Sequence, residues 1–362
     1  MRLVRPAITL GAAVVVAACS RDRSAPTVPE FLDVDLTAAL SSPSAPVPLA
    51  LRTYDGSGQA VHPDFVAPGA PWPNRLFYLA ITPYPGGDTR YENPSLYAGV
   101  DGVTWGGAPR APVPLVRPQT GYLSDPDILH DPSRNELFLY YRQSSDFDRI
   151  YLIRSPNGWA WTKPSLVVSG APSQVISPAI VRVKEGEWMM WSVNAGPGCY
   201  GSSTTVELRR SSDGLAWSAP QAVNLPIADG RFAWHLDVQW IAERHEFWAL
   251  FPVKTPGTCA TTALFIGRSA NGVDWNVEPS PVLVIGTIPE FSDIVYRSTF
   301  AYDASADEIT FWYSGARLVS DKPVWRTAVQ QRARADVFSG SRGESAEVPA
   351  PSRAVSAHFD PP

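Results

Sequence analysis

Acidic and imidazole side chains recur at the starts of three short apolar runs in this chain of 362 residues. Carboxylates held close together raise one another's pKa, so one can stay protonated while its neighbour is ionised at neutral pH. Such a pair on either side of a scissile bond is what the hydrolysis of a glycosidic bond requires. The residue types therefore indicate acid–base hydrolysis, if the fold brings them together. The three runs begin His62-Pro-Asp64, Asp125-Pro-Asp127 and His235-Leu-Asp237.

Further polar and aromatic residues lie in segments that would surround such a site. Some of these assignments have a structural alternative: Asp64 and Asp127 could bind backbone amides, Glu92 could be a turn residue, and Arg297 could only neutralise the carboxylates. The predicted catalytic residues are Asp64, Asp125, Asp127, Glu92 and Asp237. The predicted substrate-binding residues are His62, Tyr84, Asn93, Arg142, Ser177, Trp234, His235, Tyr296 and Arg297, and no residue is assigned to a metal.

The elements that must position these residues recur with a fixed period. Short aromatic and β-branched runs, separated by Gly, Pro, Asn and Asp, are typical of antiparallel strands. Small turns of the form Asx-Gly follow sets of these runs, and we interpret the turns as structural, with the tryptophan that closes each turn packing between sheets. These tryptophans are Trp105, Trp161, Trp217 and Trp275, about 56 residues apart.

Five such units of four strands predict an all-β fold, a five-bladed β-propeller with four-stranded antiparallel blades, over residues 55–335. A β-sandwich is the alternative, but a sandwich has no reason to keep a fixed period. In a propeller the innermost strand of each blade starts at the central channel. The sequence therefore predicts that acidic groups from distant segments converge on one axis.

Several of these segments together resemble bacterial proteins related to the five-bladed glycosidases of glycoside hydrolase families 43, 32, 62 and 117. The resemblance covers about residues 55–335 and implies the propeller fold and a carbohydrate substrate. The segments are His62-Pro-Asp64, Thr82-Pro-Tyr84-Pro, Glu92-Asn93-Pro-Ser, Ser124-Asp125-Pro-Asp127, Ser177-Pro-Ala, Trp234-His235-Leu-Asp237 and Tyr296-Arg297.

The resemblance to family 43 also implies three carboxylate roles. The general base falls on Asp64, or on the position of His62, and Asp125 matches the residue that orients the site and tunes its pKa values. The general acid has no match, because Ser177 follows Val175-Ile in the third blade where a glutamate is expected. A substitute acid would come from Glu92, Asp237 or a protonated His235.

His235 sits where family 43 often carries a histidine beside an axial cation, so the resemblance allows a calcium ion there. No other cofactor is expected. The missing acid keeps a second function open, a non-catalytic propeller that binds carbohydrate or a protein. The net charge of −5 gives no basic stripe, so we expect no nucleic-acid partner, and we expect a monomer.

The N-terminal segment reads as a targeting signal. Residues 1–18 combine two arginines with a short apolar stretch, and Val16-Ala-Ala-Cys19 resembles the lipobox of bacterial lipoproteins. The resemblance implies a lipid on Cys19, membrane attachment through it, and a cell-envelope location outside the cytoplasm, at the outer membrane if there are two. An ordinary secretory signal is the alternative. Residues 19–54 predict a Pro-, Ser- and Ala-rich tether, and residues 336–362 a polar tail.

Export implies an oxidising compartment, where paired cysteines form disulfides. Cys199 and Cys259 both fall in Gly- and Pro-rich loops between the second and third strands of sequential blades. Those loops should lie side by side on one face of the propeller. The sequence therefore predicts a Cys199–Cys259 disulfide, with two free thiols as the alternative.

Overall fold

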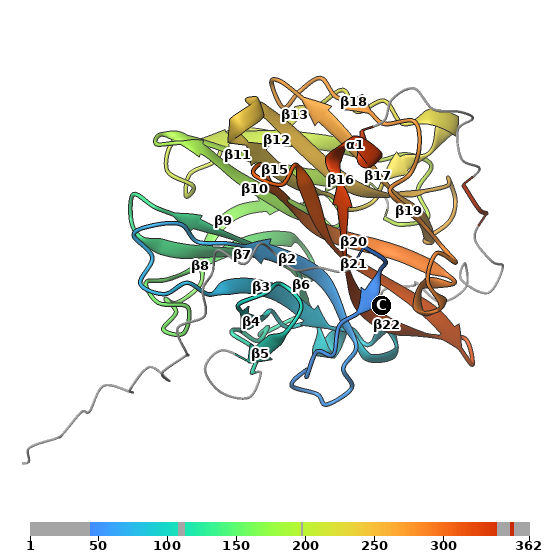
Figure 1. The fold of residues 1–362 in the computed structure, drawn as a ribbon, viewed down its shortest axis with the longest axis horizontal. Helices are drawn as coiled ribbons and strands as arrows, with labels where there is room; N and C mark the ends of the chain where they lie inside the picture. Colours follow the sequence, from blue (N-terminus) through green and yellow to red (C-terminus); the bar gives the residue numbers. More distant parts are fainter. Residues whose placement is uncertain (1–43, 108–112, 197, 339–347, 351–362) are drawn as a thin grey trace, which may run out of the picture. The chain divides into compact units, whose positions relative to one another are not determined.

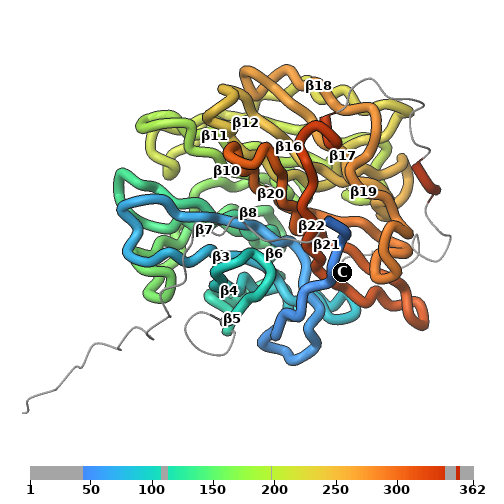
Figure 2. Tube along the Cα trace, viewed as in Figure 1, coloured from blue at the N-terminus to red at the C-terminus, as the bar shows by residue number. Residues whose placement is uncertain are grey.

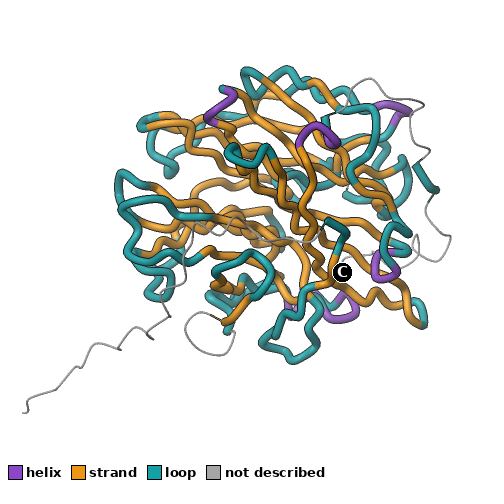
Figure 3. Tube along the Cα trace, viewed as in Figure 1, coloured by secondary structure: helices purple, strands orange, loops and turns teal. Residues whose placement is uncertain are grey.

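The computed structural model describes residues 44–107, 113–196, 198–338 and 348–350. Strands are the main secondary structure of these residues, and loops and short helical turns join them (Figure 3). Within the same residues no helix has the length and apolar character that crossing a membrane requires. The predicted signal peptide, Cys19, and most of the predicted tether and tail lie outside the described residues.

Five antiparallel sheets follow one another around the propeller (Figure 1). Blade 1 contains β2 (Ala60–Val66), β3 (Phe77–Pro83), β4 (Ser95–Gly99) and β5 (Trp105–Gly107). Blade 2 contains β6 (Tyr122–Asp131), β7 (Glu136–Ser144), β8 (Asp148–Ser155) and β9 (Ser165–Gly170). Blade 3 contains β10 (Ile176–Lys184), β11 (Glu187–Asn194), β12 (Thr205–Ser211) and β13 (Gln221–Ala222).

Blade 4 departs from the simple pattern because its inner and outer strands are each interrupted. Its inner strand is split into β14 (Phe232–Ala233) and β15 (Asp237–Ile241), which both pair with β16 (Glu246–Lys254). Its outer strand is split into β18 (Asn276–Val277) and β19 (Leu283–Val284), which both pair with β17 (Thr261–Ser269). The short helices are η1 (Pro85–Gly87), η2 (Thr89–Tyr91), η3 (Ala228–Gly230), η4 (Ala242–Arg244), η5 (Pro289–Phe291) and α1 (Arg334–Val337).

Blade 5 is built from both ends of the described chain. It contains β20 (Ile294–Asp303), β21 (Glu308–Val319), β22 (Lys322–Ala333) and, as its outer strand, β1 (Val47–Pro48). In β1, Val47 pairs with Val329 and Pro48 pairs with Ala328, so the blue and red ends of the trace lie side by side in Figure 2. Residues 47 and 48 therefore belong to the propeller and not to the tether predicted for residues 19–54.

The innermost strands form a closed ring, because β2, β6, β10, β15 and β20 each contact the next and β20 contacts β2. Between neighbouring blades lie five main clusters of buried apolar side chains. This confirms the predicted five-bladed propeller. The ring also brings the starts of the inner strands to one axis, where the candidate site lies.

The Asx-Gly turns lie at the junctions between blades and are structural. In one of them Asn271 Oδ1 accepts hydrogen bonds from the amides of Val273 and Asp274. The Trp275 Nε1 donates to the Gly272 carbonyl, and so does Trp191 Nε1 of the preceding blade, at 2.8 Å. The turn thus ties two blades together through one carbonyl oxygen.

We expect Gly272→Ala to lower the free energy of unfolding by about 2–4 kcal/mol. Gly272 has φ +73°, and an added Cβ would lie 2.6 Å from the Trp191 ring, so backbone strain and overpacking add together. Gly186→Ala is the matched control, since its φ is +74° and nothing lies within 4 Å of the added atom. Urea unfolding measures both variants. Equal losses for the two would contradict the role assigned to this junction.

Candidate active site

The inner strands carry irregularities at the positions where the sequence places its candidate residues. The strand register shifts between Val61 and Asp64 in β2 and between Ser124 and Asp127 in β6. His62 and Asp125, inside these bulges, have φ values of 53° and 49°. A bulge re-aims a side chain, and a left-handed non-glycine backbone costs about 1–3 kcal/mol and tends to occur at functional sites.

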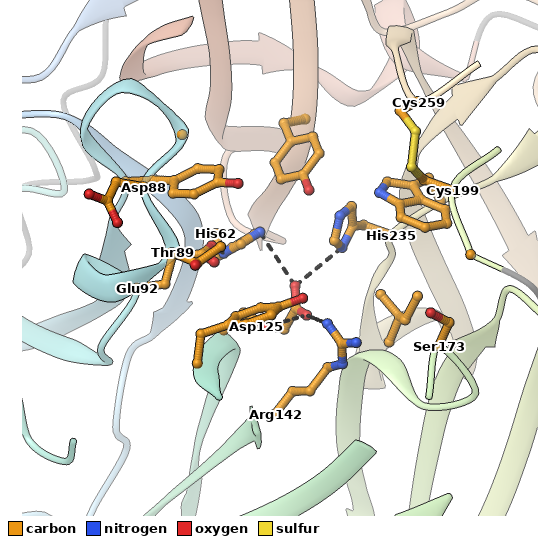
Figure 4. A pocket seen from close by; sticks show the side chains of 18 residues that line it. His62, Asp88, Thr89, Glu92, Asp125, Arg142, Ser173, Cys199, His235 and Cys259 are labelled. Atoms are coloured by element: carbon orange, nitrogen blue, oxygen red, sulfur yellow. Dashed lines mark hydrogen bonds and ion pairs between the residues drawn. A yellow bond between two sulfur atoms is a disulfide. The ribbon is translucent and has the colours of Figure 1, made fainter. Parts of the chain in front are cut away.

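In blade 4 the break between β14 and β15 has a similar effect on His235. The side chains of His62, Asp125 and His235 meet in one cavity of about 270 Å³ (Figure 4). All three are at least 97% buried, with exposed fractions of 2%, 1% and 3%. Three blades that are distant in sequence therefore contribute one cluster.

Two imidazole nitrogens approach a single carboxylate oxygen in this cluster. Asp125 Oδ1 lies 3.5 Å from His62 Nε2 and 3.2 Å from His235 Nδ1. None of these three buried atoms has a hydrogen-bond partner of good geometry. Buried polar atoms are normally satisfied, so each orphaned atom requires an explanation.

A metal ion would satisfy these three atoms together. Ligands about 2.0–2.1 Å from a tetrahedral ion lie about 3.3–3.4 Å from one another, which is close to both observed separations. Two histidines and one carboxylate also form a donor set that first-row transition metals prefer. Thr82 Oγ1 lies 2.9 Å from His62 Nδ1 and fixes the ring so that Nε2 faces the cluster.

The electrostatics favour the protonation states that bind a metal. Burial lowers the pKa of His62 to about 3 and also lowers the pKa of His235, so both imidazoles are neutral at neutral pH. Burial raises the pKa of Asp125, but the two histidines and Arg142 outweigh burial and hold that pKa well below its usual range. Neutral imidazoles and an ionised carboxylate are the forms that act as ligands.

Glu92 also lines the cavity, directly after η2. Its Oε1 lies 3.6 Å from His62 Nδ1, and the residue is 3% exposed. Burial, followed by the charge of Asp125, raises the pKa of Glu92 well above its usual range. The cavity therefore contains two carboxyl groups whose pKa values are shifted in opposite directions.

Arg142 supports Asp125 from the side of blade 2. Its Nη1 lies 3.9 Å from Asp125 Oδ2, and its Nη2 donates to Asp148 Oδ1 at 2.7 Å. Asp148 Oδ2 in turn accepts a hydrogen bond from the amide of Val175 in the next blade. Arg142 is thereby fixed in place, with its guanidinium beside the cluster.

Aromatic rings and a disulfide form the rest of the cavity wall. The Tyr296 ring centroid lies 4.5 Å from that of His235, and Trp234 and Tyr84 also line the cavity. Cys199 and Cys259 form the predicted disulfide, which joins the loops of blades 3 and 4. Both cysteines line the cavity, so the disulfide is a part of its wall.

Sequence reasoning missed Lys254, which lies beneath this wall with 1% exposure. Its Nζ is 4.4 Å from the Trp234 ring centroid and 5.0 Å from that of Phe232, and it donates to the Cys199 carbonyl. Lysine side chains are rarely buried, and nothing in the sequence around Lys254 marks it, because it ends a long apolar strand.

Burial lowers the pKa of Lys254 from 10.5 to about 8. Between pH 8 and 10.5 the unfolded chain then holds a proton that the native protein lacks, so the free energy of unfolding should rise with pH by up to ~3 kcal/mol. We expect Lys254→Met to remove this rise. Urea unfolding of both proteins across that range measures the difference. Parallel pH profiles would show that Lys254 keeps an ordinary pKa.

The predicted carboxylates do not all reach this cavity. Asp64, Asp127 and Asp237 form a second cluster two residues further along the same strands, and none of them lines the cavity of His62. Asp64 Oδ2 accepts from the Ile128 amide, and both oxygens of Asp127 accept from the Ile180 amide of the next blade. Asp64 and Asp127 therefore bind backbone amides, as the structural alternative for these two residues predicted.

Three predicted substrate-binding residues also lie outside the cavity. Ser177 is fully buried and exchanges hydrogen bonds with the backbone of Leu236. Asn93 donates to the Tyr54 hydroxyl, and Arg297 is fully buried on the axis. The cavity instead includes residues that the prediction omitted: Gly87, Asp88, Thr89, Tyr122, Ser124, Ser173, Ile176 and Gly198.

The fold is similar to that of known enzymes that act on glycans. No protein-family model matches the sequence. The A type blood N-acetyl-α-D-galactosamine deacetylase of Flavonifractor plautii is 28% identical over 308 residues, which are 71% of this chain and 40% of that protein. The chain therefore spans less than half the length of this curated relative.

Solved structures share the fold at lower identity. A crystal structure of an N-acetylgalactosamine deacetylase from F. plautii, in complex with blood group B trisaccharide, has a TM-score of 0.70 and 22% identity, over 83% of this chain and 98% of that one. The catalytic domain of the Coprinopsis cinerea GH62 α-L-arabinofuranosidase has a TM-score of 0.57 and 12% identity, over 80% and 97%. The chain has the five-bladed fold of both kinds of enzyme.

Proposed function

We propose that this protein is a metal-dependent deacetylase that removes the acetyl group from an N-acetylated sugar of a glycan. His62, Asp125 and His235 would bind the metal ion. The observation that carries the proposal is the approach of two imidazole nitrogens to Asp125 Oδ1, with all three atoms buried and without hydrogen-bond partners.

A divalent ion bound there would lower the pKa of a coordinated water and polarise the acetyl carbonyl. A residue of the chain itself would donate the proton that the reaction needs. Burial raises the pKa of Glu92, which favours its protonated form, and Glu92 lies at the wall of the same cavity. It is placed to donate this proton to the departing amine nitrogen. Arg142 keeps Asp125 ionised, and Thr82 orients His62.

The choice of an amide bond is supported by the F. plautii relative, whose name states that it is a deacetylase. The substrate class is supported by the cavity walls. Trp234 and Tyr296 offer aromatic surface for a sugar ring, and Asp88 and Thr89 offer polar groups for its hydroxyls. An N-acetylhexosamine at the end of a glycan is the substrate that we propose.

Glycosidic hydrolysis is the second candidate. Glu92 and Asp125 line one cavity with pKa values shifted in opposite directions, which is the arrangement of an acid–base pair. Against it, the glycosidase pattern needs a glutamate at the position of Ser177, which is fully buried and donates a hydrogen bond to the Leu236 carbonyl instead of lining the cavity. A propeller that binds a glycan without cleaving it is the remaining alternative.

One substrate separates these three functions. A deacetylase would release acetate from an aryl N-acetyl-α-galactosaminide, and a glycosidase would release the aryl alcohol from it. A non-catalytic propeller would only bind it. We expect acetate release that a chelator abolishes and that added Zn²⁺ or Mn²⁺ restores. Aryl release that survives the chelator would favour glycosidic hydrolysis and would overturn the deacetylase proposal, as would binding without either product.

We also propose that a lipid on Cys19 anchors the protein in the cell envelope, as the lipobox-like sequence before it suggests. Cys19→Ser should move the protein from the membrane fraction to the soluble fraction of cells that process lipoproteins. Immunoblotting of the two fractions measures this. An unchanged distribution would favour an ordinary secretory signal.

A further inference from the structure

A second cluster of oxygen ligands lies on the propeller axis, formed by Asp64, Asp127 and Asp237 from blades 1, 2 and 4. Their exposed fractions are 2%, 3% and 1%. One carboxylate oxygen from each residue lies within 4.8 Å of the other two. These residues are two positions beyond His62, Asp125 and His235 on the same strands, so the two clusters follow one another along the axis.

The scaffold holds these carboxylates from the outside and leaves oxygens facing inward. Asp237 Oδ2 accepts from Thr299 Oγ1 at 2.8 Å, and Asp64 Oδ2 accepts from the Ile128 amide. The other oxygens, Asp237 Oδ1 and Asp64 Oδ1, are buried and have no hydrogen-bond partner. Asp237 Oδ1 has no ion pair with a described residue either, so it is a buried oxygen in the cluster without a direct partner.

Arg297 separates this cluster from the cavity of His62. Its guanidinium donates to the carbonyls of Pro126, Pro178 and Leu236, which are the residues between the two levels in blades 2, 3 and 4. Its Nη2 lies 3.7 Å from Asp64 Oδ1 and 3.6 Å from Asp127 Oδ2. If all three carboxyl groups ionise to bind a cation, one guanidinium leaves two negative charges, which a divalent cation would balance.

The cluster has its own access to solvent. Asp64 and Asp127 line a cavity of about 260 Å³ that shares no lining residue with the cavity of His62. Gln239, Trp240 and Glu243 are among its other lining residues. An ion and its water ligands could therefore enter and leave without passing through the candidate active site.

We propose that Asp64, Asp127 and Asp237 bind a Ca²⁺-like cation. All the side-chain donors are oxygens, which hard cations prefer over the nitrogens that transition metals take. Ca²⁺–oxygen bonds of about 2.3–2.6 Å allow two ligands to be up to about 5 Å apart, whereas Mg²⁺ allows only about 4 Å. The ion would join three of the five inner strands, and its role is structural.

Terbium luminescence tests this proposal, because Tb³⁺ replaces Ca²⁺ and a nearby tryptophan sensitises its emission. We expect protein freed of metals by a chelator to bind one Tb³⁺ with emission excited through Trp240, and Ca²⁺ to displace it. Asp237→Asn should weaken binding by at least about tenfold. Asp125→Asn is the matched control in the other cluster and should leave the Tb³⁺ affinity unchanged.

Two measurements keep the test decisive if a variant folds poorly. After a chelator has removed bound metals, added Ca²⁺ should raise the Tm of the wild-type protein. Trp240→Phe should show the same rise in Tm but should lose the sensitised emission. No Ca²⁺-dependent change in wild-type Tm, or Tb³⁺ binding that a folded Asp237→Asn retains in full, would overturn the proposal. None of these readouts involves catalysis, so the result is independent of the deacetylase proposal.

Discussion

Asp125→Asn is expected to lower kcat/KM for acetate release by more than about 100-fold while the propeller stays folded. Losing a residue that only orients a metal ligand typically costs about 10–100-fold, and Asp125 is the one anionic ligand in its cluster. The amide is nearly the same size, so the hydrogen bond from Ser124 Oγ to Oδ2 has a replacement acceptor. Acetate release and metal content, measured on the same sample, check the prediction.

Two further variants show which step is lost. Glu92→Gln should keep the metal and lower kcat, because Glu92 is placed to donate a proton and lies outside the ligand set. Asp303→Asn changes a partly exposed carboxylate at the end of β20 that accepts from the Ser305 amide, and it should change neither metal content nor rate. Wild-type activity and metal content in Asp125→Asn would contradict the proposed site.

Arg297→Met is expected to lower the free energy of unfolding by about 3–5 kcal/mol in the presence of a chelator. Removing one partner of a buried ionic network leaves the other charges uncompensated. Arg297 is fully buried, and it would leave Asp64 and Asp127 without a cation as well as three carbonyls without a donor. Urea unfolding at neutral pH measures the loss.

The control for this experiment is Arg154→Met, which breaks a partly exposed pair with Glu136 at 3.1 Å. Surface pairs contribute about 0–1 kcal/mol, so this variant should be nearly as stable as wild type. Burial raises the pKa of Asp64 in the folded protein. The contribution of such a carboxyl group to the free energy of unfolding falls as the pH rises. The Arg297→Met deficit should therefore be larger at alkaline pH than at acidic pH. Equal deficits for the two arginine variants would contradict the axial role of Arg297.

The repeat in the sequence was sufficient to predict the propeller. Each Asx-Gly turn needs a neighbouring blade to pack against, as Gly272 packs against Trp191, so the tryptophan period reports the blade period. The Cys199–Cys259 disulfide followed from the same alignment of loops. β1 was not predicted, because Val47 and Pro48 lie in a Pro-rich segment and obtain their strand only by pairing with β22.

The candidate site was predicted only in part, for a physical reason. The sequence placed His62, Asp64 and Asp125 at strand starts, but it could not show that the bulges divide them between two levels. Arg297, which lies between the two levels, is far along the chain and donates to carbonyls of three other blades. The sequence predicted that the carboxylates of the inner strands converge on one axis. It did not show that Asp125 belongs to one cluster and that Asp64, Asp127 and Asp237 belong to a second cluster further along that axis.

The pairing of β1 with β22 also has a consequence for how the chain matures. The outermost strand of the last blade is made first, and its partner, which includes Val329, is made almost last. Contacts between such distant residues form slowly because a long loop must close. The ring of blades therefore closes only after β22 has been synthesised and has paired with β1.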